Sequence, residues 1–318
     1  MPESKKLRPV ASPAQLRGSL LMLAAAGCLA SSSILSIYIY REKVGPNTML
    51  ALRYVGAAAM LWLFYLLSKD WRPYIHLTSR RQFWGCVAVA VANSFSQSFY
   101  SIGLLKLDPG LAQMIFSFNP AITALILFFF GESLTPLKIV RLALALLGLY
   151  FLTQSSSGKP VELVSVLLIV GCAISYAIHL VLYQKLLAGT HSRTNTLYII
   201  SIMTGIYLTI EMVLHGPGAT MAVSGLAWLY IMIMALVSTA FARLLMFAGV
   251  GLIGGTQVSL IGIAEPVLVL FSSIVWLGER LSPGQWLGAG LVMVSLALAG
   301  LVKSSSINMT IFKRKEQA

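Results

Sequence analysis

The carboxyl group of Glu265 is the most unusual polar group in this sequence, because it lies inside an apolar run and directly precedes Pro266. An ionisable side chain in hydrocarbon costs roughly 2.5–3.5 kcal/mol on insertion scales, so it needs a functional or structural reason. Pro266 lacks a backbone N–H, which leaves a carbonyl oxygen without its donor one turn earlier. The pair predicts a polar site near the middle of a membrane, where burial favours the neutral acid. A Glu265 that hydrogen-bonds between helices or joins a structural ion pair is the alternative interpretation.

Two arginines interrupt other apolar runs and are candidates for the charge partner of Glu265. They are Arg53 and Arg243, each of which lies some distance inside its run. The alternative for both is snorkelling, in which the long side chain carries its charge to the lipid headgroups. Glu211 lies closer to the end of its run, so snorkelling or helix capping explains it better than a role in transport.

A polar stripe follows one face of a predicted helix. Asn93, Gln97, Tyr100 and Ser101 are spaced at i, i+4, i+7 and i+8, which places them on the same side. A stripe of this kind would be costly against lipid, so we expect it to face the protein interior. Asn93, Gln97 and Tyr100 are therefore predicted to line a pathway for substrate, with interhelical hydrogen bonding as the alternative.

Five further polar residues lie at similar depths in other apolar runs. Ser32 and Ser36 share one helical face, and Asn119 stands beside a proline. Tyr176 and His179 share a face of a later run, where a lone histidine is more often a hydrogen-bonded core group than a proton relay. Together with Glu265 they could complete a polar cavity for substrate.

The elements that must hold these residues are membrane-spanning helices. The 318 residues are 58% hydrophobic and only 10% charged, whereas soluble domains carry about 25% charged residues. A spanning helix needs roughly 20 apolar residues. Ten runs, of which the fifth is short and has a basic start, predict an all-α integral membrane protein with ten transmembrane helices: 19–39, 48–67, 83–103, 110–130, 138–153, 162–185, 196–214, 226–249, 254–277 and 285–302.

The net charge of +13 is concentrated in short loops and tails. The chain has 23 Lys and Arg residues. If the N-terminus is cytoplasmic, sixteen of them fall in cytoplasmic segments and five in outer segments. The positive-inside rule then predicts a multi-pass protein of the cell membrane with both termini in the cytoplasm. No basic stretch is interleaved with aromatic residues, so we expect no nucleic-acid partner.

One motif occurs twice in the sequence. Residues 131–136 read Gly-Glu-Ser-Leu-Thr-Pro and residues 278–283 read Gly-Glu-Arg-Leu-Ser-Pro. Five predicted spans separate the copies, and an odd number places them in opposite orientations, as in the inverted repeats of secondary transporters. We interpret the glycine, glutamate and last proline of each copy as structural residues that end a helix and shape a turn: Gly131, Glu132, Pro136, Gly278, Glu279 and Pro283.

The segment from Glu265-Pro266-Val267 through the second motif to Gly288-Ala289 resembles the EamA family of the drug/metabolite transporter superfamily. The first copy is similar to it more loosely, and Arg53-Tyr54 resembles an Arg-aromatic pair of that family. The resemblance covers about residues 19–302. It implies a ten-helix carrier of five plus five helices that exports or exchanges small metabolites by alternating access.

The predicted organisation has four parts. A cytoplasmic N-terminal tail (1–18) precedes a first five-helix repeat (19–153), and a second repeat (161–302) precedes a cytoplasmic C-terminal tail (303–318). The two repeats differ in detail. Arg141 occupies the position that matches Gly288, which argues against close helix packing at that point of the first repeat.

The leading hypothesis is a secondary transporter for a small polar or amphipathic metabolite, with amino acids as the first guess. An acid, a potential arginine partner and several amides would suit a zwitterion. Nothing in the sequence matches a phosphate-binding loop, a paired-histidine metal site or a nucleophile elbow, so we expect no enzyme activity, cofactor or metal. The three cysteines, Cys28, Cys86 and Cys172, are expected to be small buried hydrophobic residues.

Two other classes of protein stay open from the sequence. A membrane-embedded enzyme acting on a lipid-linked substrate would need a close catalytic constellation, and a structural or sensory membrane protein would need no continuous polar cavity. The expected partners are a small-molecule substrate and the lipid bilayer, with a homodimer left open.

Overall fold

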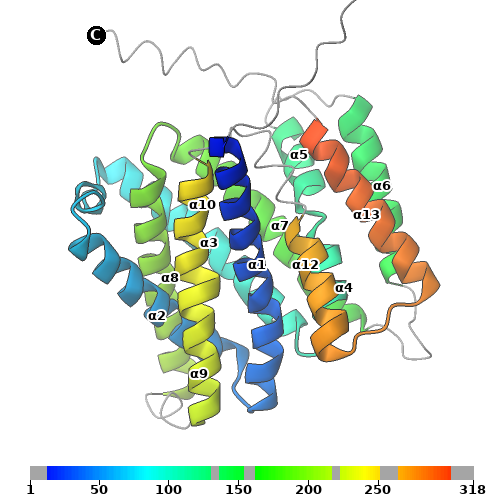
Figure 1. Cartoon of the computed structure of the whole chain (residues 1–318), viewed down its shortest axis with the longest axis horizontal. Coiled ribbons are helices and arrows are strands. Elements are labelled where there is room, and N and C mark those ends of the chain that lie inside the picture. Colours follow the sequence, from blue (N-terminus) through cyan, green and yellow to red (C-terminus); the bar gives the residue numbers. More distant parts are fainter. Residues whose placement is uncertain (1–12, 130–135, 154–161, 217–222, 251–263, 302–318) are drawn as a thin grey trace, which may run out of the picture.

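All regular secondary structure in the described part of the chain is helical (Figure 1). The computed structural model describes residues 13–129, 136–153, 162–216, 223–250 and 264–301. The first half contains α1 (Pro13–Arg41), α2 (Pro46–Leu67), the 3-10 segment η1 (Arg72–Ile75), α3 (Arg80–Gly103), α4 (Pro109–Phe116), α5 (Asn119–Phe129) and α6 (Pro136–Leu152). The second half contains α7 (Leu163–Leu186), α8 (Ser192–His215), α9 (Gly225–Ile233), η3 (Met234–Phe241), α10 (Ala242–Val250), α12 (Ala264–Ser272), η4 (Ser273–Leu277) and α13 (Pro283–Leu301).

These helices group into ten spans, as the sequence predicts. The helices α4 and α5 form one span, and so do α9, η3 and α10, in which η3 is π-helical. Within the described residues, six spans are long and apolar enough to cross a membrane by length and composition alone. The helix α3 is 24 residues long but contains the polar stripe, and α6 has only 17 residues.

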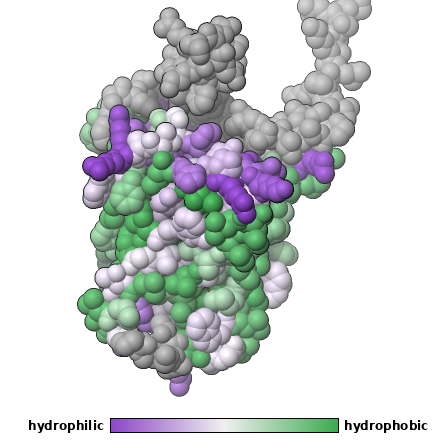
Figure 2. All heavy atoms as spheres, turned by 90° about the vertical axis from the view of Figure 1, so that its left-hand side faces the viewer, coloured by the Kyte–Doolittle hydropathy of each residue, from purple (hydrophilic) through white to green (hydrophobic). Residues whose placement is uncertain are grey.

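The surface fits a lipid environment. Large apolar side chains such as Leu63, Phe95 and Trp276 are 57–62% exposed, which a water-soluble protein would avoid over so wide an area. Figure 2 shows that hydrophobic side chains cover most of the body on one face, while hydrophilic side chains gather near one end. We call the end at which α1 begins the N-side and the other end the opposite side.

Local sequence determines where several helices begin. Pro46 and Pro109 stand in the first turns of α2 and α4, where the missing N–H costs nothing because it would have no intrahelical acceptor. Ser79 and Ser224 are the N-caps of α3 and α9, and their side chains accept hydrogen bonds from Gln82 N and Ala227 N.

The packing of the helices repeats when the two halves are exchanged. The repeat pairs α1 with α7, α2 with α8, α3 with the α9–η3–α10 span, α4–α5 with α12, and α6 with α13. The contact of α3 with α7 corresponds to the contact of α1 with η3 and α10. In the same way, the contact of α1 with α12 corresponds to the contact of α7 with α4 and α5. Equivalent spans also pack on each other, in the pairs α2–α8, α4–α12 and α6–α13.

The two halves run in opposite directions. Lys106, just after α3, forms a 2.6 Å ion pair with Glu162, just before α7, so α7 begins where α3 ends. The hydrogen bond from Lys106 also lowers the pKa of Glu162. Ser224 at the start of α9 likewise donates to Glu42 Oε2, just after α1 (2.8 Å). Because α1 and α3 both run from the N-side to the opposite side, α7 and α9 start at the opposite side and the repeat is inverted.

The helices α6 and α13 approach each other closely at two glycines. A Cβ atom added to Gly288 would lie 2.7 Å from the Gly148 carbonyl oxygen, and one added to Gly148 would lie 3.0 Å from that of Gly288. The repeat offset of 147 positions converts this Gly148–Gly288 contact into a contact between Arg141 and Ser295. That contact exists: Arg141 Nε donates to Ser295 O (3.2 Å) and Ser295 Oγ donates to Arg141 O (2.9 Å).

The expectation that Arg141 prevents close packing was therefore wrong. Its side chain is buried, with only 8% exposed, and its guanidinium binds a backbone carbonyl of α13 instead of holding the helices apart. In the repeat, Arg141 is equivalent to Gly288, and Ser295 is equivalent to Gly148. The contact of Gly288 with Gly148 therefore corresponds to the contact of Arg141 with Ser295.

We expect Gly288→Ala to destabilise the protein by about 1–3 kcal/mol, because the new methyl group would overlap the backbone of α6. The matched control is Gly290→Ala on the same helix, where a Cβ atom meets nothing within 4 Å. That control should be neutral or slightly stabilising, since alanine favours helices over glycine. Thermal unfolding of the detergent-purified variants measures both effects. Equal melting temperatures for the two variants would contradict the close approach.

The second copy of the repeated motif ties the two halves together. Gly278 ends η4 in the left-handed conformation (φ 71°), and Glu279 follows it with only 8% of its surface exposed. The Glu279 carboxylate accepts hydrogen bonds from the backbone N–H groups of Gly110 and Leu111, both at 3.0 Å, and from the Ser273 hydroxyl. It therefore caps the start of α4 in the other half, instead of acting only at the end of its own helix.

Of the other motif residues, some lie in the part of the chain that the structure describes and some lie outside it. Pro136 and Pro283 begin α6 and α13. Gly131 and Glu132 lie outside the described residues.

Candidate functional site

A polar cavity of about 90 Å³ lies between the two halves, near the middle of the spans. Its walls come from α1, α2, α3, α4, α7 and α12. The residues that line it are Leu29, Ser32, Ser33, Ser36, Arg53, Gln97, Tyr100, Ser101, Gln113, Phe116, Cys172 and Glu265. Ser32, Ser36, Gln97, Tyr100 and Glu265 belong to the predicted pathway residues, and Arg53 to the predicted charge partners.

A chain of hydrogen bonds joins three helices at this cavity. Tyr100 OH donates to Gln113 Oε1 (3.0 Å) and also lies 2.9 Å from Ser33 Oγ. The helices α1, α3 and α4 are thereby fixed relative to one another. Ser36 satisfies its hydroxyl on the Ser32 carbonyl one turn earlier (2.9 Å), which removes it from this chain.

Glu265 stands in the first turn of α12 and faces the cavity. Its carboxyl group interacts with the Gln113 side chain and, electrostatically, with Arg243. Among the described residues, no ion pair within 4.0 Å involves Glu265. The carboxyl group is thus held by an amide and is not neutralised by direct contact with a cation.

Arg53 reaches the same cavity from α2 and is buried, with 8% of its surface exposed. Its Nε donates to Thr239 Oγ1 (2.8 Å), and its guanidinium carbon lies 5.6 Å from the centre of the Tyr54 ring. The snorkelling interpretation of Arg53 was therefore wrong. Within the described part of the chain, no carboxylate lies within 4.0 Å of this guanidinium group. A buried cation without an anion is unfavourable.

The π-helical segment η3 holds Thr239, which accepts a hydrogen bond from Arg53, and Ser238, which contacts Ser31 of α1. A π-turn inserts one extra residue, which breaks the regular helical pattern, and such turns often occur at functional sites. The Thr239 hydroxyl donates to the carbonyl of Met234 five residues earlier (3.2 Å), and Ser238 Oγ lies 2.8 Å from Ser31 Oγ of α1. The π-turn thereby turns two adjacent hydroxyl groups toward the first half.

Four predicted pathway residues lie outside the cavity walls. Asn119 Nδ2 donates to Phe116 O at the junction of α4 and α5 (3.1 Å). Asn93 is buried between α3 and α8, where its Nδ2 faces Met203 Sδ at 3.5 Å and its Oδ1 has no hydrogen-bond partner. Tyr176 and His179 stack with ring centroids 5.3 Å apart, on the N-side of Cys172 along α7.

The stack on α7 adjoins the cavity. Tyr176 contacts the ring of Phe116, which lines the cavity, at a centroid distance of 5.2 Å. Arg243 interacts electrostatically with Tyr176, His179 and Glu265. Polar and aromatic groups therefore continue from the cavity toward the N-side.

Glu211 lies away from this site, and its surroundings differ from the snorkelling that the sequence analysis offered for it. It is 1% exposed, accepts a hydrogen bond from Thr48 Oγ1 (2.6 Å) and forms a 3.1 Å pair with His215. Its carboxylate joins the end of α8 to the start of α2 and does not snorkel.

The sequence analysis missed several lining residues. Gln113 is the clearest case, because it is an amide inside the apolar run 110–130, six positions before Asn119, and its place in that run could have indicated it. Ser33 adjoins a predicted residue but points to Tyr100 instead of sharing the Ser32–Ser36 face. Cys172 is buried as expected, yet it also lines the cavity and lies 3.2 Å from Ser96 Oγ.

Ten spans in two inverted halves around a polar cavity define a membrane transporter. Two domains of the EamA-like transporter family match the chain, over residues 16–154 and 163–301. The chain belongs to the EamA-like transporter family.

Individual relatives agree with this assignment. The chain is 27% identical over 266 residues to the "Probable amino-acid metabolite efflux pump" of Escherichia coli (strain K12), with 80% of this chain and 87% of the relative covered. It is 26% identical over 237 residues to the "Uncharacterized transporter YvbV" of Bacillus subtilis (strain 168), with 71% and 75% covered. A solved crystal structure shares the fold, with a TM-score of 0.59 at 18% identity over 97% of this chain and all of the other.

Proposed function

We propose that this protein is a secondary carrier that exports or exchanges a small zwitterionic amino acid, or a closely related metabolite, by alternating access. The observation that carries the proposal is the pair of ionisable groups at one cavity, Arg53 and Glu265, which are not joined to each other by an ion pair. A zwitterion offers a carboxylate to Arg53 and an ammonium group to Glu265, so it complements both.

The neighbouring groups fit the same ligand. Gln113 and Gln97 are amides that can accept from an ammonium group or donate to a carboxylate. The cavity of about 90 Å³ is far smaller than the roughly 300–1,000 Å³ of typical ligand pockets, which favours a small solute in this conformation. The Escherichia coli relative is named a "Probable amino-acid metabolite efflux pump", which points to the same substrate class.

Exchange assays in proteoliposomes would test the substrate class. Vesicles loaded with alanine, serine or threonine should drive uptake of the same radiolabelled amino acid. The amine analogue, which lacks the carboxylate, and the 2-hydroxy acid, which lacks the ammonium group, should compete at least tenfold less well, because each leaves one buried charge unpaired. Equal competition by either analogue would contradict recognition by both charges.

We further propose that both termini are cytoplasmic. Arg17, Lys69, Arg80 and Arg193 are among the basic residues that lie at the N-side, and the positive-inside rule assigns that side to the cytoplasm. In whole cells, a membrane-impermeant maleimide should label Ser282→Cys from outside and Lys69→Cys only after permeabilisation. Labelling of Lys69→Cys in intact cells would reverse the orientation.

A further inference from the structure

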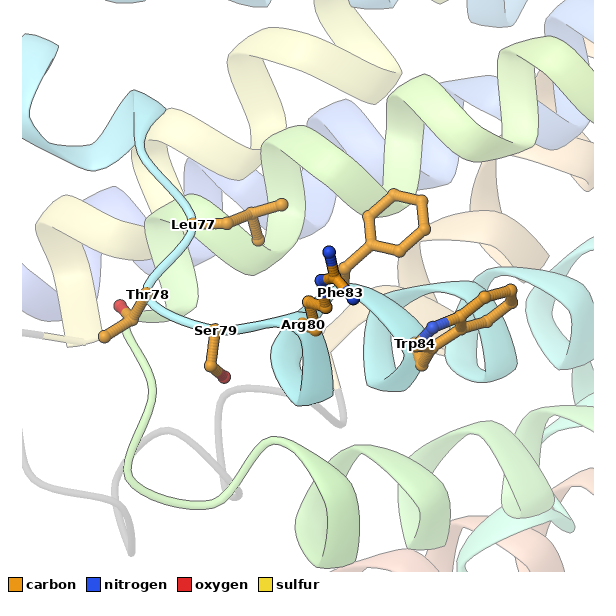
Figure 3. Close-up of a pocket in the computed structure, with 6 residues that line it drawn as sticks. All are labelled: Leu77, Thr78, Ser79, Arg80, Phe83 and Trp84. Carbon is orange, nitrogen blue, oxygen red and sulfur yellow. The ribbon is translucent and has the colours of Figure 1, made fainter.

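A surface pocket of about 590 Å³ lies at the N-side end of α3, separate from the central cavity (Figure 3). Figure 3 shows its six lining residues, of which Leu77, Thr78 and Ser79 precede α3 while Arg80, Phe83 and Trp84 belong to its first turns. Arg80 lines the pocket, and Arg81 is the next residue of α3; both are exposed, and neither forms an ion pair with an acidic residue of the described chain. The pocket therefore combines free positive charge with two aromatic rings.

The chemistry of this pocket suits a phosphate group at the surface of a membrane. The guanidinium groups can donate several hydrogen bonds to phosphate oxygens. The first N–H groups of α3 have no acceptor within the helix and add positive potential at the same point. Trp84 is 66% exposed and stands beside them, as tryptophans do at the headgroup level of a bilayer.

A second, apolar groove of about 440 Å³ lies further along α3, toward the middle of the membrane. It is formed by Ala88, Val91, Ala92 and Phe95 of α3 together with Ser175, Ile178 and Leu182 of α7. Residues 84, 88, 91, 92 and 95 follow one face of α3, so the pocket and the groove are aligned. The distance from residue 84 to residue 95 is about 16 Å at the rise of an α-helix, comparable with the length of an acyl chain.

We propose that this face of α3 and α7 is a binding site for one anionic phospholipid. The phosphate headgroup binds at Arg80 and Arg81, and an acyl chain occupies the groove that ends near Phe95. Charge complementarity selects the occupant, since a neutral lipid would leave both arginines without a counter-charge. The α3–α7 pair links the two halves, so a lipid bound there contacts both of them.

Native mass spectrometry of the full chain in detergent would test the site, with phosphatidylglycerol and phosphatidylcholine as probes of matched acyl length. Wild type should retain phosphatidylglycerol more tightly than phosphatidylcholine. The double variant Arg80→Gln/Arg81→Gln should weaken phosphatidylglycerol binding about thirtyfold, because each basic residue near an anionic surface contributes about 1 kcal/mol. The control Arg17→Gln removes an exposed arginine of the same side outside the pocket and should retain wild-type binding.

A second pair of variants tests the groove independently of charge. Ala92→Trp should fill the groove and weaken phosphatidylglycerol binding, whereas Leu147→Trp on the exposed face of α6 should not. Three results would overturn the proposal: equal retention of both lipids by wild type, full displacement of phosphatidylglycerol by millimolar inorganic phosphate, or a dimer that Ala92→Trp converts to monomer without loss of lipid. The last result would assign the face to a second copy of the chain.

Discussion

We expect Arg53→Gln to lower kcat/KM for a zwitterionic amino acid by at least about 30-fold while leaving the protein as stable as wild type. The loss follows because a buried, charge-assisted pair contributes roughly 2–5 kcal/mol that a neutral amide cannot replace. Stability should be retained because the variant removes a buried cation that has no carboxylate within 4.0 Å in the described chain. Exchange in proteoliposomes and thermal unfolding of the same preparation measure the two quantities.

The matched control for this variant is Arg41→Gln. Arg41 is exposed at the end of α1 and lies over the Tyr38 ring, 5.3 Å from its centre, so it has a similar aromatic contact without the cavity. It should transport normally. A large fall in melting temperature for Arg53→Gln, together with normal transport by the surviving folded protein, would make Arg53 a structural residue.

We expect Glu279→Ala to destabilise the protein by roughly 1–3 kcal/mol, because it leaves the N–H group of Leu111 buried without its acceptor and leaves Gly110 N with only the Ser273 hydroxyl at 3.3 Å. Glu279→Gln should be intermediate, since its amide oxygen can still accept. Transport should fall as well, because Gln113 of the cavity lies one turn beyond these N–H groups on α4. Melting temperatures should therefore follow the order wild type, Gln, Ala.

A substitution on the other side of the same contact tests it separately. A Cβ atom at Gly110 would lie 2.4 Å from Glu279 Oε2, so Gly110→Ala should displace the carboxylate and reproduce part of the loss. Gly205→Ala on α8, where a Cβ atom meets nothing within 4 Å, is the control. Wild-type stability of Gly110→Ala and Glu279→Ala would show that Glu279 does not join the halves.

Features that depend on residues within one helix could be predicted from the sequence. The spacing of Gln97, Tyr100 and Ser101 placed them on one face, and all three line the cavity. The inverted repeat followed from the odd number of spans between two motif copies. Both inferences use periodicity and parity, which a single sequence contains in full.

Features that depend on distant segments could not be predicted in this way. Glu279 caps α4 through Gly110, which lies 169 positions earlier, and no local pattern indicates that partner. The Arg141–Ser295 contact became interpretable only when the crossing of α6 and α13 was known. Asn93 shares the periodicity of the stripe on α3. The later residues of the stripe line the cavity, whereas Asn93 packs against α8, where it meets Met203. The spacing of residues shows which of them share a helical face, but it does not show where along that face one neighbouring element gives way to another.

Transport by Glu265→Gln tests the central claim most directly. Glu265 and Arg53 line one cavity without an ion pair, and we propose that a zwitterion bridges them. In proteoliposomes, Glu265→Gln should raise the KM for alanine or serine at least tenfold and leave competition by the corresponding 2-hydroxy acid unchanged, since that acid lacks the ammonium group. Wild-type KM values for the amino acids in a stable Glu265→Gln variant would contradict the proposed binding of the substrate ammonium group.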